Sequence, residues 1–421
     1  MAKKYIWSIL LLLGFSVLTL SGDEFRKIEI GKDNKVQIGL EFENMYTQVV
    51  ALNPSVYAGK PSAEDFNAMP RKTVDGDHAA DEREAKHRIF FRPYLRASTV
   101  GTRSLGVTGI KDWEMRTQPG RVTYNRDYKR ENIYLKTEFS LALPSDLADM
   151  QIEVRLKNTG RRACKVEFGS EFIFLKDELE PLNLMLQREV TRYSNGQRQQ
   201  YLTNDYTKLT GNTQSYWWRR IVKDQRVFGY YVNRELIPFT YPRLEPPSLF
   251  GAVSIFGNGT LLWDMRNTEK LSLLDVSWDV NTGKLMPVWK MEIKGKEEKV
   301  IVFKVITLRN IHNINAITDD WIFGYKANSD QLHITSAPLK PQPRTALQTT
   351  VKDPGGMVII QQRNEVTSCT PFRPARVELR ATSSFIPNVP YSIKMLLRTL
   401  PSEAGEQKIE QLADLENTFL P

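Results

Sequence analysis

The stretch QIEVRLKNTGRRACKVEFGSEFIFL, Gln151–Leu175, decides the fold class of this chain. Apolar residues alternate with charged ones over Ile152–Lys157, and the alternation resumes over Cys164–Phe168 after the turn signal Asn158-Thr159-Gly160. This pattern predicts two antiparallel strands joined as a hairpin, each with one buried face. Phe172–Leu175 is apolar on both faces, which is typical of a strand inside a larger sheet.

Similar stretches extend from this hairpin in both directions along the 421 residues. Ile133–Leu143 alternates over a long strand, and the turn signals Gly257-Asn258-Gly259 and Asn281-Thr282-Gly283 separate further strand-like runs. Strands do not alternate with helices, so the chain is predicted to be mainly β.

Composition divides the chain into two β domains. We predict a large β domain over 23–312, a connecting segment over 313–344 that contains Pro338, Pro341 and Pro343, and a small β-sandwich over 345–421. Ile409, Leu412 and Leu415 recur at helical spacing within Glu403–Asn417, which predicts a short C-terminal helix.

The first 22 residues resemble a secretory signal peptide. Lys3 and Lys4 precede an apolar run, and small residues at Thr19 and Ser21 provide a cleavage site. An uncleaved anchor is the alternative, although the run is short for one. We expect an extracytoplasmic protein, periplasmic or secreted, with no stable membrane span after cleavage. Export permits a disulfide between Cys164 and Cys369, but Cys164 on an apolar strand face favours a buried free thiol.

The charge balance favours an anionic partner. The formal net charge is +9, and Arg71–Arg130 alone holds 14 Lys/Arg against 8 Asp/Glu. Such an excess attracts polyanions. No nucleic-acid-binding motif occurs, so outside the cytoplasm we expect a carbohydrate, acidic or sulfated, rather than nucleic acid. A solvated surface without a partner is the alternative.

Two aromatic and cationic clusters are candidate ligand-binding sites. The first, within His87–Arg96, contributes Arg92, Tyr94 and Arg96; the second, after a polar insertion at Glu189–Thr213, contributes Trp217, Trp218, Arg219 and Arg220. Aromatic rings stack on sugar faces while arginines bind carboxylate or sulfate in a forked geometry. The alternative for both clusters is ordinary packing, with rings in the core and arginines in solvent.

Motifs for catalysis are absent from the sequence. It has no GxSxG, HExxH, P-loop or dinucleotide fingerprint, and its four histidines show no metal spacing. The acidic residues around His78 do not complete a calcium loop. We therefore predict no cofactor and no metal site.

The region from about Phe25 to Asn310 resembles the galactose-mutarotase-like β-supersandwich. The resemblance rests on the long series of strands and on the piece LKNTGRRACKVEFGSEFIF, in which a strand, an N-T-G turn and a second strand precede aromatic residues. In that family a histidine follows the second strand, whereas this chain has Ser170-Glu171-Phe172 there. The resemblance implies a sugar-facing concave sheet more than it implies epimerisation. The C-terminal part is similar to immunoglobulin-like modules in its strand pattern.

Three functions remain open. The first is a non-catalytic, exported carbohydrate-binding or carbohydrate-processing accessory protein. The second is a sugar-active enzyme on the same scaffold, an epimerase, lyase or hydrolase, with Glu171 as candidate general base. The third is a structural protein whose basic surface contacts an anionic envelope.

Overall fold

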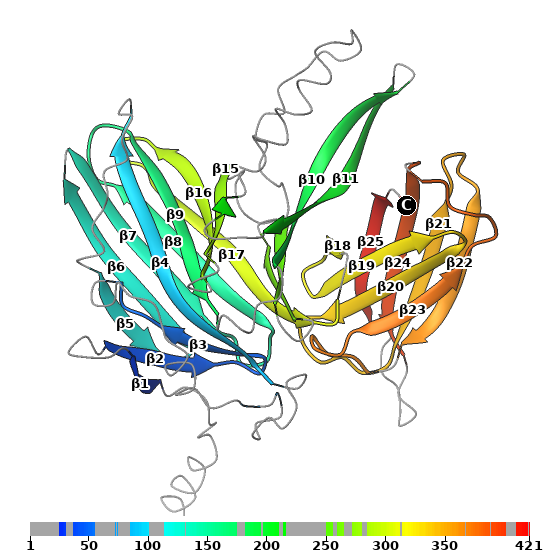
Figure 1. Ribbon diagram of the computed structural model, residues 1–421, viewed down its shortest axis with the longest axis horizontal. Helices are drawn as coiled ribbons and strands as arrows, with labels where there is room; N and C mark the ends of the chain where they lie inside the picture. The colour runs from blue at the N-terminus through cyan, green and yellow to red at the C-terminus, as the bar shows by residue number, and fades with distance from the viewer. Residues whose placement is uncertain are drawn as a thin grey trace, which may run out of the picture.

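The computed structural model describes residues 25–30, 37–54, 72, 74, 85–100, 113–130, 132–174, 182–194, 197–209, 214–215, 250–255, 259–264, 272–279, 284–311, 314–366, 368–387, 389–400, 410–419 and 421. All regular secondary structure in these residues is β-strand, arranged as two large and two small sheets (Figure 1). The predicted mainly β fold class is confirmed. Within these ranges, no helix of the length and hydropathy needed to cross a bilayer occurs.

The first large sheet has eight strands in the order β1-β2-β3-β4-β9-β16-β15-β12. Neighbours are antiparallel except for the parallel pair β3 and β4. The strands are β1 (Arg26–Ile30), β2 (Gln37–Glu43), β3 (Thr47–Ala51), β4 (His87–Thr99), β9 (Cys164–Ile173), β16 (Lys284–Ile293), β15 (Ser272–Asp279) and β12 (Gln214–Ser215).

The second large sheet has nine strands in the order β11-β10-β13-β14-β17-β8-β7-β6-β5. All its neighbours are antiparallel. The strands are β11 (Gln197–Leu209), β10 (Leu182–Ser194), β13 (Phe250–Ile255), β14 (Gly259–Asp264), β17 (Glu298–Arg309), β8 (Asp149–Asn158), β7 (Ile133–Ala142), β6 (Arg121–Arg130) and β5 (Glu114–Gln118).

The main hydrophobic core lies between these two sheets. It receives alternate residues of β4, β9 and β16 from one side and of β6, β7, β8 and β17 from the other. Because successive side chains of a strand point to opposite faces, each strand also carries an outer face. On β4, the outer face therefore carries the even-numbered residues, which include Arg92, Tyr94 and Arg96.

The hairpin predicted around Asn158-Thr159-Gly160 is wrong, although both of its strands are correct. β8 pairs with β7 and β17 in the nine-stranded sheet, whereas β9 pairs with β4 and β16 in the other. The turn thus crosses from one sheet to the other, and the apolar faces of β8 and β9 meet across the core. Asn158 fixes the corner, since its Oδ1 accepts the Gly160 N–H at 2.9 Å and its Nδ2 donates to the carbonyls of Arg162 and Ile293.

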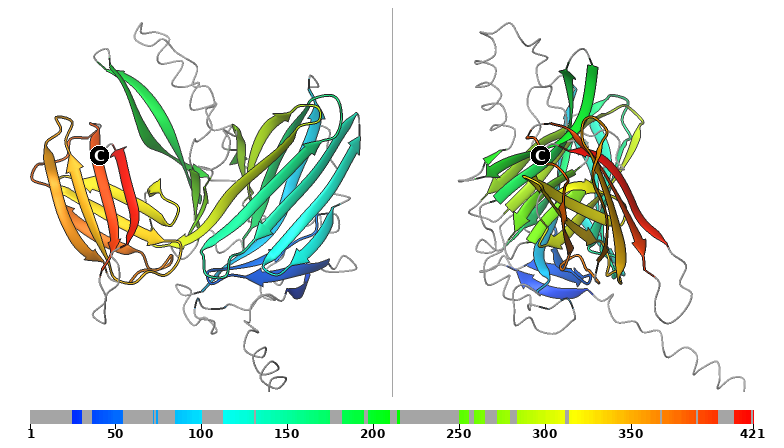
Figure 2. Two further views of the ribbon diagram at one scale, coloured as in Figure 1. Left: turned by 180° about the vertical axis from the view of Figure 1, so that it is seen from behind. Right: turned by 90° about the vertical axis from the view of Figure 1, so that its right-hand side faces the viewer.

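The strand-like runs predicted on either side of the other two turn signals form paired strands. The pairing of β13 with β14 extends as far as Ile255 and Gly259, next to the turn. The pairing of β15 with β16 likewise extends as far as Asp279 and Lys284. The insertion at Glu189–Thr213, expected to be irregular, instead contains the second part of β10, from Glu189 to Ser194, and all of β11; the two strands pair over thirteen residues. Their hairpin rises between the two lobes of the molecule in front and rear views (Figures 1 and 2).

The C-terminal lobe is a sandwich of two four-stranded sheets. One has the order β18-β19-β20-β23 and the other β22-β21-β24-β25. Their facing side chains form one cluster, in which the rings of Tyr325 and Phe419 lie 5.4 Å apart. The strands are β18 (Ile314–Ile317), β19 (Trp321–Asn328), β20 (Gln331–Pro338), β21 (Thr345–Lys352), β22 (Val358–Val366), β23 (Ala375–Arg380), β24 (Tyr391–Thr399) and β25 (Gln411–Phe419).

Two expectations about this lobe differ from the structure. The segment 313–344, expected to connect the domains, contains β18, β19 and β20 of the sandwich. The predicted C-terminal helix is wrong, because Gln411–Phe419 forms β25 and pairs along the edge of β24. The open edge of β24 offers backbone hydrogen bonds that outweigh the weak helical spacing. The exact domain boundaries and the immunoglobulin-like character of the lobe stay predictions.

The two cysteines are free and lie in separate clusters. Cys164 belongs to the main core and Cys369 to the core of the C-terminal sandwich. Burial raises the pKa of each thiol to about 11, which keeps both protonated and unreactive near neutral pH. The alternative of a disulfide between them is therefore wrong.

A third cluster joins the two lobes. Tyr46, Leu308 and Ile311 of the large part pack there with Ile322 and Phe372 of the C-terminal lobe. The His87 ring lies 5.1 Å from the ring of Phe372, and the Arg309 guanidinium lies over the same ring at 4.9 Å. The interface therefore buries a histidine against a fixed cation.

This interface predicts lower stability at acidic pH. Burial, reinforced by Arg309, lowers the pKa of His87 well below its usual 6.5. Below about pH 6.5 the unfolded chain therefore binds a proton that the folded chain excludes, and the free energy of unfolding falls by up to about 1.4 kcal/mol per pH unit. Urea denaturation midpoints at pH 8 and 5.5 measure this fall, which should be smaller in His87→Gln. An equal fall in both proteins would show that other groups cause it.

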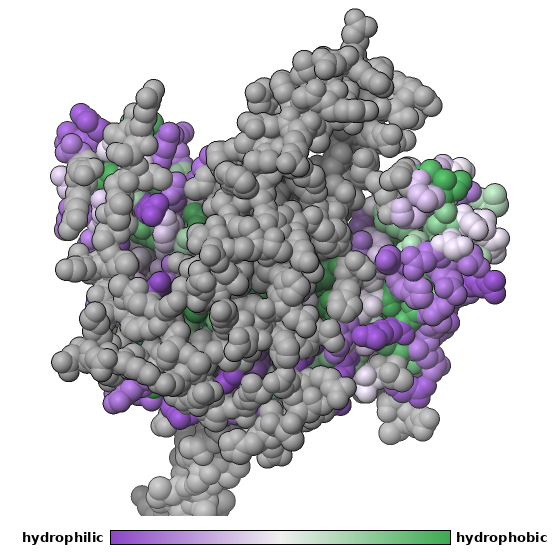
Figure 3. All heavy atoms as spheres, viewed as in Figure 1, coloured by the Kyte–Doolittle hydropathy of each residue, from purple (hydrophilic) through white to green (hydrophobic). Residues whose placement is uncertain are grey.

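On the face that Figure 3 shows, the C-terminal lobe is largely hydrophilic, with hydrophobic side chains at its upper end and on its lower part. Met357, Val358 and Ile386 are the exposed large hydrophobic residues of this lobe among those described. Nothing in the described residues covers them.

Candidate functional site

The candidate site lies on the outer face of the eight-stranded sheet, where β4, β9 and β16 are neighbours. Three cross-strand rows follow from the register. Arg92 lies opposite Glu171. Tyr94 lies opposite Gly169, which itself lies opposite Val288, and Arg96 lies opposite Glu167, which itself lies opposite Lys290. The site thus has an apolar middle row between two charged rows.

The first charged row is a buried ion pair. The Arg92 guanidinium donates from Nε to the Glu171 carboxylate, and both residues are less than a tenth exposed. An apolar cluster that includes Val50, Phe90 and Ile173 lies beside this pair on the same face. In these surroundings the ion pair offsets the cost of burying both charges and holds both side chains in place.

The second charged row is more accessible. Arg96 and Glu167 are half-buried, and Lys290 is exposed. Burial raises the pKa of Glu167, whereas the positive charges of Arg96 and Lys290 act to lower it. The row therefore holds two cations around one carboxylate, which leaves positive charge for an anionic ligand.

The middle row places an aromatic ring between the charges. The Arg96 guanidinium lies over the Tyr94 ring at 5.5 Å. Burial raises the pKa of Tyr94 to about 12, so its hydroxyl stays protonated and can donate a hydrogen bond. Gly169 faces Tyr94 from β9, and a Cβ there would lie 2.2 Å from the Pro287 carbonyl oxygen, so only glycine fits this close approach to β16.

The structure brings together four residues named from the sequence for two separate reasons. Arg92, Tyr94 and Arg96 were candidates for ligand binding and Glu171 for catalysis, and all four share one face of β4 and β9. Trp217, Trp218, Arg219 and Arg220 lie outside the described residues, as do His78 and the acidic residues around it. Among the described residues, no group of three or more His, Cys, Asp or Glu side chains is arranged to hold a metal.

Sequence reasoning missed Glu167 and Lys290. Each is one charged position in an alternating strand, and nothing in the local sequence distinguishes it from other such positions. Only the register of β9 with β4 and β16 places both beside Arg96.

The arrangement suits binding of a polar ligand that combines hydroxyl and acidic groups. Guanidinium and ammonium groups bind carboxylate or sulfate, Glu167 accepts hydrogen bonds from hydroxyls, and Tyr94 offers an amphipathic ring. Of the histidines in the described ranges, His87 lies in the interface between the lobes and His333 in the C-terminal sandwich. The described histidines therefore do not lie at the candidate site.

A comparison with solved structures finds that this chain is similar to galactose-mutarotase-like proteins. A galactose mutarotase related enzyme from Lactobacillus acidophilus matches with a TM-score of 0.36 at 11% identity, covering 67% of this chain and 98% of that chain. A galactose mutarotase-like protein from Lactobacillus casei matches with a TM-score of 0.36 at 7% identity, covering 64% and 99%. The GH36 alpha-galactosidase AgaA from Geobacillus stearothermophilus matches with a TM-score of 0.29 at 9% identity, covering 68% of this chain and 41% of that chain.

These matches agree with the galactose-mutarotase-like resemblance of the sequence. Their TM-scores lie below 0.5, so the similarity concerns the arrangement of strands and carries no information on activity. No protein-family model matches the sequence, and no curated protein matches it.

Proposed function

We propose that this chain is an exported carbohydrate-binding or carbohydrate-processing accessory protein for acidic or sulfated glycans. The observation that carries the proposal is the three-row site, in which Tyr94 lies between the Arg92–Glu171 pair and the Arg96–Glu167–Lys290 row. The signal-peptide pattern of residues 1–22, which lie outside the described residues, supports export.

Each row has its own role in the proposed complex. Arg96 and Lys290 bind the carboxylate or sulfate, because both cations are accessible while a single carboxylate lies between them. Glu167 accepts hydrogen bonds from sugar hydroxyls, and the Tyr94 ring supports one face of the sugar. The buried Arg92–Glu171 pair acts as a positioning element that keeps β4 and β9 in register. Trp217, Trp218, Arg219 and Arg220 stay proposed contacts of the same ligand.

The site predicts that Arg96 is needed for glycan binding. Arg96→Gln removes a charged donor, and hydrogen bonds to charged groups contribute about 1.5–3 kcal/mol, so affinity should fall by about 10-fold or more. Retardation of the mature chain, 23–421, in gels that contain neutral, uronic-acid or sulfated polysaccharide measures this loss.

Arg398→Gln is the matched control, because it removes one exposed arginine from β24 in the other lobe. Equal loss in both variants would mean that only the overall positive charge attracts the glycan. Retardation that is lost at moderate salt with every anionic polymer would support the structural, envelope-contacting alternative instead.

A sugar-active enzyme on the same scaffold is the second candidate, because Glu171 shares its face with the proposed ligand contacts. In that case Glu171 is the candidate general base. A folded Glu171→Gln variant that retains full turnover of an identified substrate would remove Glu171 from this role.

A further inference from the structure

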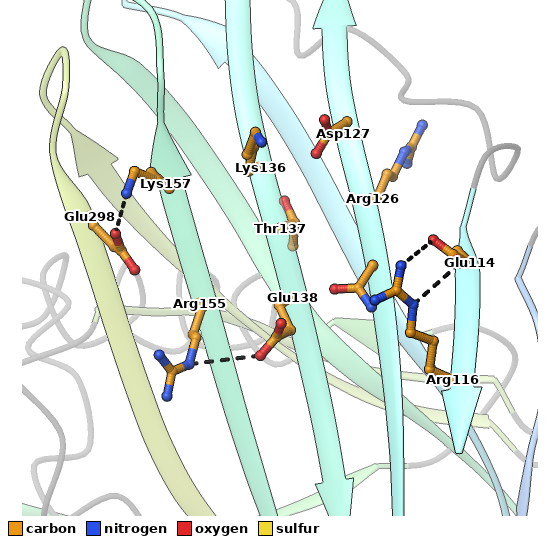
Figure 4. A pocket seen from close by; sticks show the side chains of 11 residues that line it. Glu114, Arg116, Arg126, Asp127, Lys136, Thr137, Glu138, Arg155, Lys157 and Glu298 are labelled. Atoms are coloured by element: carbon orange, nitrogen blue, oxygen red, sulfur yellow. Dashed lines mark hydrogen bonds and ion pairs between the residues drawn. The ribbon is translucent and has the colours of Figure 1, made fainter. Parts of the chain in front are cut away.

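The nine-stranded sheet carries a hollow that the proposed site does not use. It has a volume of about 500 Å³ and is lined by residues of β5, β6, β7, β8 and β17 (Figure 4). The alternate residues of these strands enter the main core, so the hollow lies on the outer face of its sheet, across the core from Arg96.

Strand register arranges the charges of the hollow in rows. One row runs from Asp127 on β6 through Lys136 on β7 and Lys157 on β8 to Glu298 on β17. Figure 4 shows the two lysines on neighbouring strands with the acids on either side of them. The next row places Glu138 of β7 opposite Arg155 of β8.

The centre of the first row places two cations directly opposite each other, Lys136 and Lys157. Lys157 binds the Glu298 carboxylate at 2.8 Å, whereas Lys136 is exposed and forms no ion pair with any described residue. Like charges directly opposite each other on neighbouring strands destabilise a sheet. An anion bound between the two ammonium groups would remove this repulsion.

An exposed aromatic residue, Tyr134, lies on the same face of β7 as Lys136. Tyr134 precedes Lys136 by two positions on β7, so both side chains share the outer face. Tyr134 is 45% exposed, one of few large hydrophobic residues in the described ranges with this much exposure. Its ring offers an amphipathic surface next to an anion site.

We propose that this hollow is a second binding site for an acidic sugar residue. A carboxylate or sulfate lies between Lys136 and Lys157, the sugar ring packs against Tyr134, and Asp127 and Glu138 accept hydrogen bonds from its hydroxyls. The site shares no residue with the β4–β9–β16 face. The chain therefore binds two glycan segments on opposite sheets, and a long glycan or two neighbouring chains gain avidity from both.

Calorimetric titration of the mature chain tests the proposal by stoichiometry. The probes are trigalacturonate, which carries carboxylates, and a chondroitin sulfate tetrasaccharide, which adds sulfate. Wild type should bind two molecules of at least one probe, and Lys136→Gln/Lys157→Gln should bind one, with the lost site weakened at least 10-fold. Tyr134→Ala should weaken the same site, whereas Lys326→Gln, an exposed lysine of β19 in the other lobe, should leave both sites unchanged.

The outcomes separate this site from the one on β4, β9 and β16. One wild-type site that Arg96→Gln abolishes and the lysine double variant retains would overturn the second site alone. One wild-type site that the lysine double variant abolishes and Arg96→Gln retains would support the hollow and overturn the function proposed for Arg96. Two sites that persist in the lysine double variant, or no binding of either probe, would overturn the hollow as a sugar site.

Discussion

Replacing Trp289 with alanine is expected to lower the free energy of unfolding by about 3–5 kcal/mol. Trp289 lies on β16 with no exposed surface, its ring 6.1 Å from that of Phe168 on β9 and 5.1 Å from that of Phe303 on β17. It thus contacts both large sheets at the centre of the main core. Alanine would leave a cavity that the surrounding strands, fixed by their hydrogen bonds, fill only in part.

Chemical denaturation of the chain over residues 23–421 measures the effect of this replacement. Val300→Ala is the control, because Val300 is 49% exposed on the outer face of β17 and should change stability by less than about 0.5 kcal/mol. A Trp289→Ala variant with the wild-type midpoint would mean that the two sheets do not pack around this ring.

Removing Arg92 is expected to have an effect of similar size for an electrostatic reason. Arg92→Met deprives the buried Glu171 carboxylate of its guanidinium partner, and breaking a buried ion pair in this way costs about 3–5 kcal/mol. Replacing both partners, Arg92→Met with Glu171→Leu, should cost much less, because neither charge of this pair remains buried.

A double-mutant cycle on stability measures the coupling within this pair. The matched control is Arg116→Met on β5, which breaks the ion pair with Glu114 at 3.2 Å. Both partners are about two thirds exposed there, so the cost should stay below about 1 kcal/mol. If Arg92→Met costs no more than Arg116→Met, the Arg92–Glu171 pair does not hold β4 and β9 together.

The candidate site could be predicted from the sequence in part. Arg92, Tyr94 and Arg96 stand at alternate positions in one stretch, so any strand there places them on a common face. Glu171 comes from a strand 79 residues further along, and no local pattern links it to Arg92. Lys290 is more distant still and joins the site only through the pairing of β9 with β16.

The C-terminal segment, predicted to be a helix, shows how pairing with a neighbouring strand overrides a local pattern. Ile409, Leu412 and Leu415 fit helical spacing, yet Ala413, Leu415 and Phe419 also alternate as a strand requires. In β25 these three residues lie opposite Leu397, Met395 and Tyr391 of β24, and they join the core of the C-terminal sandwich. Burial against an existing sheet edge decided between two patterns that the sequence contains.

By itself, the sequence determined the position of strands with clear alternation, such as β8 and β9, and which face of each is buried. Alternation over Ile152–Lys157 and Cys164–Phe168 is a local property, since the backbone of a strand turns successive side chains to opposite sides. Only the tertiary structure decided that these two strands belong to different sheets. A hairpin and a corner between sheets present the same alternation, and the difference lies in partners such as β4 and β17, whose contacts are distant in sequence and depend on the packing of the whole core.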